Sequence, residues 1–499
     1  MIKRLFICLL TLMTSVSLFA GTDSKATVKE KSAVAQHIEA HLKPYGFIRN
    51  YFAYDSRECM SGTGELYNFL PQDHAFNELG EDLNRQDSFK FLSLTTRLGL
   101  NITGYQVGKT HFGGKIEGDF YAGLSGISKV SGTATFRLRQ AYMTLAWKDL
   151  PMAGEQTAQV DLKAGQAWHP MAADMPDIFS LNTGAPFGPF SRTPQVTMDA
   201  SLGNHWVISA SALWQMQYTS AGPAGASANY IKHSCTPEMY AGLSYKTGGF
   251  LARLGVDLLS IKPRIHGTRM VEQNIDGTLV TKSATVKVKD RITTLSPFLY
   301  LQYKKGDFAF KAKSVLAQAG EHMNLMGGYG VSAYNEDGSW EYTPLTTSSS
   351  WISLSYGRKV KGVLFAGYIQ NLGTSKPLAD LTREYPDAAW KLDGVEVPAE
   401  EISKYSTVFY HKSGFANINS MVRVTPTIMY NVGKFTLGLE YEMTGVHYGD
   451  SIDSIQVDEG EKGDFSKIVR CVNASNGLAD TGLHWVFNHR VQMMMKFTF

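Results

Sequence analysis

Segments of alternating polarity dominate this sequence, and they come in pairs joined by very short turns. One pair is RITTLSPFLYLQY and FAFKAKSVLAQ, joined by KKGD, and another is MVRVTPTIMYN and FTLGLEYEMTG, joined by VGK. Long polar segments at 321–348, 374–419 and 450–480 separate such pairs. Short turns at one rim and long loops at the other are typical of a transmembrane β-barrel. The sequence therefore predicts an all-β fold, a single transmembrane antiparallel β-barrel with short periplasmic turns and long extracellular loops.

Charged residues occupy every second position in several of these segments. Arg423, Glu440 and Glu442 each lie between apolar neighbours. Successive side chains of a strand point to opposite faces, and charged side chains cannot face lipid, so we expect them to face a wet interior. After the amino-terminal segment, no run of about 18 apolar residues occurs, which excludes a bundle of membrane helices.

Sixteen strands are predicted from this alternation. They lie near residues 46–56, 89–103, 111–123, 135–147, 159–169, 194–201, 206–217, 237–247, 250–263, 291–303, 308–319, 349–359, 363–373, 420–431, 435–448 and 483–499. An even number places both ends of the barrel on the same, periplasmic side. A barrel of roughly 16 strands is wide enough to leave an aqueous channel.

The amino-terminal segment has the layout of a secretory signal peptide. Two basic residues precede an apolar run from Leu5 to Phe19, and small residues follow. We therefore expect a signal peptide at 1–20, a periplasmic extension at 21–45 and the barrel at 46–499. Apolar residues spaced four apart predict a short amphipathic helix within the extension. Export and a barrel fold together indicate the outer membrane of a Gram-negative bacterium.

Aromatic residues flank the short turns, on the apolar face of each strand. Amphipathic rings at one height beside the turns are what an interfacial girdle requires. Ordinary aromatic enrichment in strands explains one or two of these rings but not their repetition. The predicted aromatic girdle consists of Tyr245, Phe250, Tyr303, Phe308, Tyr356, Tyr430 and Phe435.

Basic residues recur at inward positions of the first strands, with acids such as Asp55, Glu117, Asp119 and Asp161 between them. One interpretation is that these charges pair with one another and keep the interior solvated. The other is a charged pore wall that orders water and biases ion flow. The predicted basic residues lining the pore are Arg49, Arg97, Lys115, Arg137, Arg139 and Lys163.

The segment after the fifth strand, HPMAADMPDIFSLNTGAPFGPFSRTPQ, is rich in apolar residues and proline, unlike the other loops. A fully solvated loop does not need these apolar side chains, whereas folding into the barrel would bury them. Folding inward would also bring two carboxylates across from the arginines and narrow the channel. The predicted residues of this constriction loop are Asp174, Asp177, Phe179 and Phe187.

Arrangements typical of catalysis or of a resident metal are missing from the sequence. No phosphate-binding glycine loop and no G-x-S-x-G motif occur. HIEAH differs from the HExxH zinc motif, and the acidic residues between 450 and 464 lack EF-hand spacing. A net charge of +3 is too small to suggest nucleic acid. We therefore expect no catalytic residue, no metal, no cofactor and no nucleic-acid partner. A disulfide between Cys59 and Cys471 and two reduced thiols both remain open.

Several features together resemble known outer-membrane channels. An inward third loop after the fifth of sixteen strands, and Phe499 at the end of the last strand, resemble the general trimeric porins of Gram-negative bacteria. The segments GFIRNYFAYDSR, GEDLN, TTRLGLNITG, FRLRQAYMTL and LKAGQAWHPM resemble the porins of Bacteroidota and the DcaP-like channels. In general porins the sixth strand contributes to the arginine cluster, whereas its inward positions here are Thr197 and Asp199.

The resemblance implies a homotrimer in contact with outer-membrane lipid and lipopolysaccharide. It also implies that the barrel-assembly machinery reads Phe499 as a signal. We expect a porin for passive diffusion of small hydrophilic solutes and no enzymatic activity. The first alternative is a substrate-selective channel for small anions such as dicarboxylates or sugar acids. An alternative from another class is an outer-membrane adhesin or structural barrel, which predicts little conductance.

Overall fold

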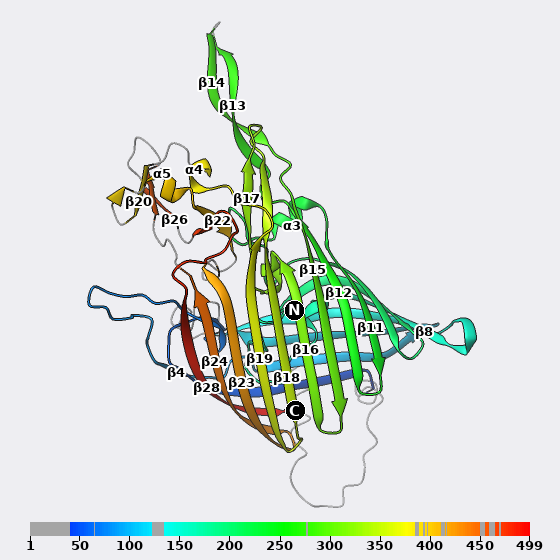
Figure 1. Cartoon of the computed structure of the whole chain (residues 1–499). Helices are drawn as coiled ribbons and strands as arrows, with labels where there is room; N and C mark the ends of the chain where they lie inside the picture. Colours follow the sequence, from blue (N-terminus) through cyan, green and yellow to red (C-terminus); the bar gives the residue numbers. More distant parts are fainter. Residues whose placement is uncertain are drawn as a thin grey trace, which may run out of the picture.

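The computed structural model describes residues 40–63, 65–121, 134–275, 278–384, 389–392, 395–396, 398–410, 415, 417–449, 455–458, 465–468 and 471–499. Sixteen antiparallel strands form a closed barrel (Figure 1). They are β1 (Leu42–Asp55), β5 (Arg97–Val107), β6 (Thr110–Tyr121), β7 (Thr135–Pro151), β8 (Thr157–Trp168), β9 (Arg192–Leu202), β10 (Trp206–Leu213), β11 (Glu238–Thr247), β12 (Phe250–Ile261), β15 (Ile292–Lys305), β16 (Phe308–Gln318), β18 (Trp340–Tyr356), β19 (Val360–Thr374), β23 (Ile418–Val432), β24 (Phe435–Tyr448) and β28 (His484–Thr498). Each of the sixteen predicted strands corresponds to one of these, so the predicted fold class is confirmed.

The first and last strands close the barrel. β28 pairs with β24 on one side and with β1 on the other, where Phe47 lies opposite Thr498 and Asp55 opposite Arg490. β1 begins at Leu42 rather than at residue 46, and the predicted amphipathic helix lies almost entirely outside the described residues. The predicted signal peptide lies outside them as well.

The second barrel strand is interrupted near its middle. β4 (Ser88–Leu92) pairs with the end of β1, and β5 pairs with the beginning of β1. Between them Thr95 has a positive φ of 65°, and its backbone N–H donates to the carbonyl of Phe120. The break lets the strand change direction while β1 keeps a partner along its length.

Hairpin turns gather at one end of the barrel, which we call the turn rim, and long connections gather at the other, the loop rim (Figure 1). Five of the turns contain a glycine with φ between 51° and 58°, a backbone conformation that glycine adopts without steric cost. These are Gly108, Gly203, Gly248, Gly306 and Gly433. The predicted contrast between short turns and long loops is therefore correct.

Additional short elements lie in the connections. They are β2 (Cys59–Gly62), β3 (Tyr67–Pro71), η2 (Ala153–Glu155), η3 (Pro170–Ala172), α3 (Asn229–Ser234), β13 (His266–Ile275), β14 (Thr278–Lys287), η4 (Gly320–Met323), β17 (Tyr329–Tyr334), α4 (Leu381–Glu384), β20 (Ala389–Leu392), β21 (Val395–Glu396), α5 (Ala399–Ile402), β22 (Tyr405–Phe409), β25 (Ile455–Asp458), β26 (Phe465–Ile468) and β27 (Cys471–Asn473). The β13–β14 hairpin, which the sequence did not predict, projects away from the barrel (Figure 1). Among the described helices, none has the length and apolar character needed to cross a membrane.

Burial in the barrel strands is the reverse of that in a soluble protein. In β24 and β28, Glu440, Glu442 and Arg490 are at most 1% exposed, whereas Leu439 and Val491 are 53% and 45% exposed. Apolar side chains therefore cover the outer surface, and polar ones face inward. An outer surface of this kind is stable in lipid, as predicted from the alternation.

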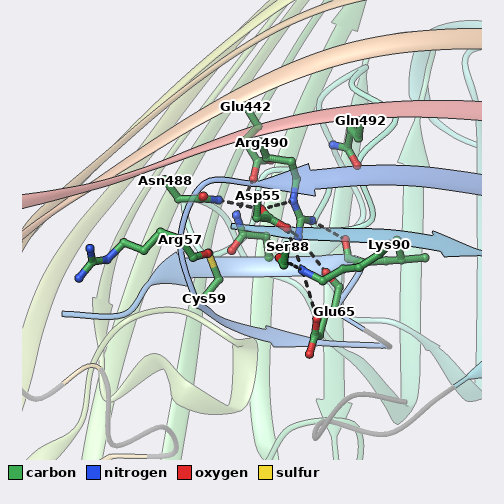
Figure 2. Close-up of polar contacts among 12 residues, drawn as sticks. Asp55, Arg57, Cys59, Glu65, Ser88, Lys90, Glu442, Asn488, Arg490 and Gln492 are labelled. Carbon is green, nitrogen blue, oxygen red and sulfur yellow. Dashed lines mark hydrogen bonds and ion pairs between the residues drawn. The ribbon is translucent and has the colours of Figure 1, made fainter. Parts of the chain in front are cut away.

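A network of ion pairs joins the closing strands from the inside (Figure 2). Arg490 binds Asp55 through two parallel contacts of 2.8 and 2.7 Å, and Asn488 donates to the same carboxylate at 2.8 Å. Lys90 of β4 bridges Asp55 at 3.0 Å and Glu65 at 3.1 Å. Paired hydrogen bonds between a guanidinium and a carboxylate are among the stronger polar contacts in proteins. The network links β1, β28, β4 and the first loop.

Candidate functional site in the barrel lumen

Loop 3 (residues 169–191) folds into the barrel, as predicted. Met171 and Phe187 are fully buried, and Ile178, Phe179 and Phe190 are at most 8% exposed. All but Phe179 belong to a buried cluster with residues of the opposite wall, including Trp351 of β18 and Phe365 of β19. Phe179 belongs to a second cluster with Tyr51 and Met494. Burying these apolar side chains is what draws the loop inward.

Lysines of the far wall hold the first half of loop 3. Lys313 of β16, itself buried, donates to the carbonyl oxygens of Met171 at 2.6 Å and Asp174 at 2.7 Å. Lys311 lies 2.6 Å from the carboxylate of Asp177, and Lys361 of β19 lies 3.3 Å from it. The two predicted carboxylates therefore pair with basic residues of the wall behind the loop. Asp174 does so through Arg253 of β12, at 3.4 Å.

The second half of loop 3 is bound to the wall formed by β23, β24 and β1. The hydroxyl of Tyr51 donates to the carbonyl of Phe179 at 2.9 Å, and Glu440 accepts from the backbone N–H of the same residue at 3.1 Å. Arg423 donates to the carbonyl of Ala185 at 2.7 Å and lies 5.1 Å from the ring centre of Phe187. The backbone of Phe179 and the ring of Phe187 therefore attach loop 3 to this wall.

Loop 1, the connection between β1 and β4, also enters the lumen, and this was not predicted from the sequence. Its β2–β3 hairpin is held by Arg423, which donates to the carbonyl of Phe69 at 2.7 Å, and by Asn68, which donates to Glu442 at 3.1 Å. The signal was available, because the run from Leu66 to Leu70 in this loop is as apolar as the core of loop 3. Two insertions, not one, therefore narrow the channel.

The outer part of loop 1 is fastened by a second ion pair. Arg57 lies 2.6 Å from Asp82, and Nδ1 of His74 lies 2.7 Å from the same carboxylate. Burial works to raise the pKa of Asp82, but the hydrogen bonds from Arg57 and His74 outweigh it and hold the pKa well below its usual range. Arg57, which alternation places on the inner face, thus stabilises loop 1 through this ion pair. Cys59 nearby has a free thiol, and the side chain of Cys471 lies outside the described residues.

Between loop 3, loop 1 and the wall of β1, β5, β7 and β9 lies a cavity of about 800 Å³, which we call the basic cavity. Within the part of the chain that the structure describes, its lining includes seven basic side chains and a single carboxylate, that of Asp177. The basic residues are Arg49, Arg97, Arg137, Arg139, Arg192, Lys361 and Lys496.

Three of these arginines share two carboxylates that are buried behind them. Arg139 lies 2.9 Å from Glu117 and 2.6 Å from Asp119, and Arg137 lies 2.8 Å from Asp119. Arg97 is more distant, at 3.7 Å from Glu117. Both carboxylates are at most 3% exposed, so the arginines and not the acids face the cavity. The carboxylates hold the arginines in place and only partly offset their charge.

Two further arginines of the cavity, Arg49 and Arg192, have no carboxylate within ion-pair distance among the described residues, whereas Lys361 pairs with Asp177. Arg49 donates to the hydroxyl of Thr95 at 2.7 and 3.1 Å. Arg192 lies 4.8 Å from the ring centre of Trp168, and its buried Nη1 makes no hydrogen bond to the part of the chain that the structure describes. Among the described residues, the basic side chains of the cavity therefore outnumber the carboxylates that pair with them, and its low-dielectric walls focus the resulting field.

The other two predicted basic residues lie away from the basic cavity. Lys115 lies 5.1 Å from the ring centre of Tyr45, in a separate hollow, and Lys163 lies 5.7 Å from that of Tyr142. Three of the basic residues that line the cavity were not predicted, namely Arg192, Lys361 and Lys496. Arg192 and Lys361 lie at strand ends, where alternation is a weak guide, whereas the alternation of the last strand did point Lys496 inward.

Aromatic residues of the predicted girdle lie beside the turns. Phe250 is opposite Tyr303, and Phe308 is opposite Tyr356. Five of the seven have exposed side chains, namely Tyr303, Phe308, Tyr356, Tyr430 and Phe435; Tyr245 and Phe250 are partly buried. The backbone N–H of Phe499 donates to the carbonyl of Gly46 at 3.1 Å, at the same end of the barrel.

Comparison with solved structures finds barrels of similar fold. The outer membrane channel DcaP of Acinetobacter baumannii is 17% identical, with 96% of this chain and 100% of that chain covered and a TM-score of 0.53. An anion-selective porin from Comamonas acidovorans is 11% identical over 92% of this chain and 99% of its own, with a TM-score of 0.44. The first likeness supports the fold. No protein-family model and no curated protein sequence matches the chain.

Proposed function

We propose that this chain is an outer-membrane porin through which small hydrophilic solutes diffuse passively, with a preference for small anions. The observation that carries the proposal is the basic cavity, in which seven basic side chains face a single carboxylate. The apolar outer surface and the inward loop 3 support a channel in a bilayer. The fold likeness to an outer membrane channel supports the same location.

The preferred solutes follow from the chemistry of the cavity. A guanidinium presents paired N–H donors that match a carboxylate or phosphate. Among the described residues, Arg49, Arg97 and Arg192 have no carboxylate bound through two parallel hydrogen bonds. Small carboxylates, including dicarboxylates and sugar acids, fit a cavity of about 800 Å³. Apolar solutes are disfavoured because they cannot replace water that the charges orient.

The ion pairs of loop 3 determine the sign of this preference. Asp174 and Asp177 are engaged by Arg253, Lys311 and Lys361 on the wall behind the loop. The loop therefore opposes the arginines with little free negative charge. We infer that the cavity attracts anions rather than passing both signs equally.

The wider setting of the channel belongs to the same proposal. Lipid and lipopolysaccharide surround the barrel, three chains assemble, and the barrel-assembly machinery recognises the strand that ends at Phe499. The porin resemblance of the sequence supports these three statements. The passage needs no cofactor and no chemical step.

Liposome swelling tests the proposal. Refolded protein is inserted into liposomes, which are then diluted into an iso-osmotic solution of a sodium dicarboxylate, a neutral sugar of similar size or a cationic amine salt. We expect the fastest swelling with the dicarboxylate. Liposomes that contain inserted barrels but do not swell with any solute would contradict a diffusion channel and favour an adhesin or structural barrel. Equal rates for all three solutes would contradict the anion preference alone.

A further inference from the structure

Two histidines and two carboxylates form a buried cluster beside the lumen. His169 is the first residue of loop 3, Glu238 is the first of β11, Asp257 lies in β12 and His322 lies in η4. All four side chains are at most 2% exposed. None of the four lines the basic cavity, so the proposed transport function makes no use of them.

Three of the four side chains, those of His169, Glu238 and Asp257, each place one possible ligand atom within 4.8 Å of the other two, and His322 lies next to them. Nε2 of His169 lies 2.7 Å from Oε1 of Glu238 and 3.8 Å from Oδ1 of Asp257. Nε2 of His322 lies 3.4 Å from Oε1 of Glu238 and 3.7 Å from Oδ2 of Asp257. With bonds of about 2.1 Å, neighbouring ligand atoms of a tetrahedral zinc ion are roughly 3.4 Å apart. The contact between His169 and Glu238 therefore has to lengthen, and His322, which is not one of the three mutually close side chains, has to move towards the ion.

Several polar atoms of the cluster have no hydrogen-bond partner among the residues that the structure describes. They are Oε2 of Glu238, Oδ1 of Asp257 and both ring nitrogens of His322. Buried polar atoms in native proteins are nearly always satisfied, because leaving them unpaired is costly. With neutral imidazoles, the two carboxylates also leave a buried negative charge that a divalent cation would balance.

We propose that His169, Glu238, Asp257 and His322 form a binding site for a divalent transition metal ion, with Zn²⁺ as the ion that best fits. Imidazole and carboxylate ligands in a tetrahedral arrangement favour zinc. When Nε2 of His169 binds the ion, the ring proton moves from that nitrogen to Nδ1. The ring then gives up the 3.2 Å hydrogen bond that Nδ1 accepts from the backbone N–H of Met171.

Such an ion has a defined structural consequence. It ties the first residue of loop 3 to two barrel strands and to η4. Loop 3 is then fixed at its start by the metal, and further along by Lys313 and Lys311. The rival arrangement is a metal-free cluster in which the histidines pair directly with the two carboxylates.

Zinc content tests the site directly. The full chain is refolded in detergent with Zn²⁺ and dialysed against metal-free buffer. Its zinc content is then measured by elemental mass spectrometry. We expect about one zinc ion per chain and a higher thermal unfolding midpoint than in protein treated with EDTA. His322→Ala and Asp257→Asn should each lose the zinc. His233→Ala, which changes an exposed histidine on α3, is the matched control and should keep it.

The outcomes separate the two arrangements. Zinc retained by the wild type and the control but lost from the two variants supports the site. Wild type without zinc, or variants that retain it, overturns the proposal in favour of the ion-pair cluster. If both variants fail to fold, the visible absorption spectrum of Co²⁺ bound to the wild type distinguishes the two arrangements. Strong visible absorption typical of tetrahedral cobalt supports the four ligands, and the weak absorption of octahedral cobalt contradicts them.

Discussion

Many polar side chains in the lumen form ion pairs. Because these pairs are buried, removing one partner should lower the stability of the fold. Asp55 and Arg490 illustrate this, because both are at most 1% exposed and join the first strand to the last. Removing one member of a buried ion pair leaves the other charge without compensation. The closing seam is therefore where a single substitution should affect stability most.

We predict that Asp55→Ala lowers the free energy of unfolding by roughly 3–5 kcal/mol, the range for a broken buried ion pair. Urea unfolding of the refolded barrel in lipid vesicles measures the change. The control is Arg358→Ala, which removes an ion pair with Asp307 at the exposed turn rim. Exposed pairs contribute little, so the control should unfold as the wild type does. Equal effects of both substitutions would contradict the role assigned to the seam.

Alternation predicted which side chains face the lumen, but it did not predict which of them line the basic cavity. Alternation assigns a side chain to the inner or outer face, and it pointed Arg49, Arg97, Arg137 and Arg139 inward, where they line the basic cavity. It does not say at what height along the barrel a side chain lies. Lys115 and Lys163 accordingly lie elsewhere. Contacts between distant segments, such as the cluster of His169 with Glu238, have no local signal.

Among the structural elements, the two inward loops decide how wide the channel is. Loop 3 was predictable because its apolar composition differs from that of the other loops. The β2–β3 hairpin was missed although it has a shorter run of the same kind, and the β13–β14 hairpin was missed inside a segment expected to be loop. The barrel strands were predictable because every one of them must alternate in order to separate lipid from water.

Loop 3 should become mobile when its main clamp is removed. Lys313 is buried and donates to two carbonyl oxygens of the loop. We predict that Lys313→Met leaves both carbonyls without a donor, at a cost of about 1–3 kcal/mol each, and raises the noise of the open-channel current. Single-channel recordings in planar bilayers measure this. Lys305→Met, at the exposed turn rim, is the control. A variant as quiet as the wild type would show that the loop does not depend on this lysine.

Deleting a hairpin should widen the channel only if the hairpin lies in the lumen. We predict that replacing Cys59–Pro71 by a short Gly-Ser linker raises single-channel conductance, because Tyr67 and Phe69 of this segment line the basic cavity. Deletion of His266–Lys287, which removes the projecting β13–β14 hairpin, is the matched control and should leave conductance unchanged. An unchanged conductance in the first variant would contradict the role of loop 1.

At the scale of the whole molecule, the fold separates three environments. An apolar outer surface meets lipid, ion pairs and hydrogen bonds hold the inward loops against the barrel wall, and the basic cavity remains between these loops and the wall of β1, β5, β7 and β9. Assembly into trimers is a prediction from the porin resemblance, and it would appear as conductance steps in groups of three. The central claim concerns one chain, namely that the charge of the cavity selects anions.

The reversal potential in a potassium chloride gradient tests that claim most directly. We compare the wild type with a variant carrying Lys361→Glu and Lys496→Glu, two basic residues of the cavity that are partly exposed. The control carries Lys232→Glu and Lys282→Glu, which change the net charge equally at exposed positions of α3 and β14. We predict anion selectivity for the wild type and the control, and a clear shift towards cations for the cavity variant. A cation-selective wild type, or the same shift in both variants, would contradict the account.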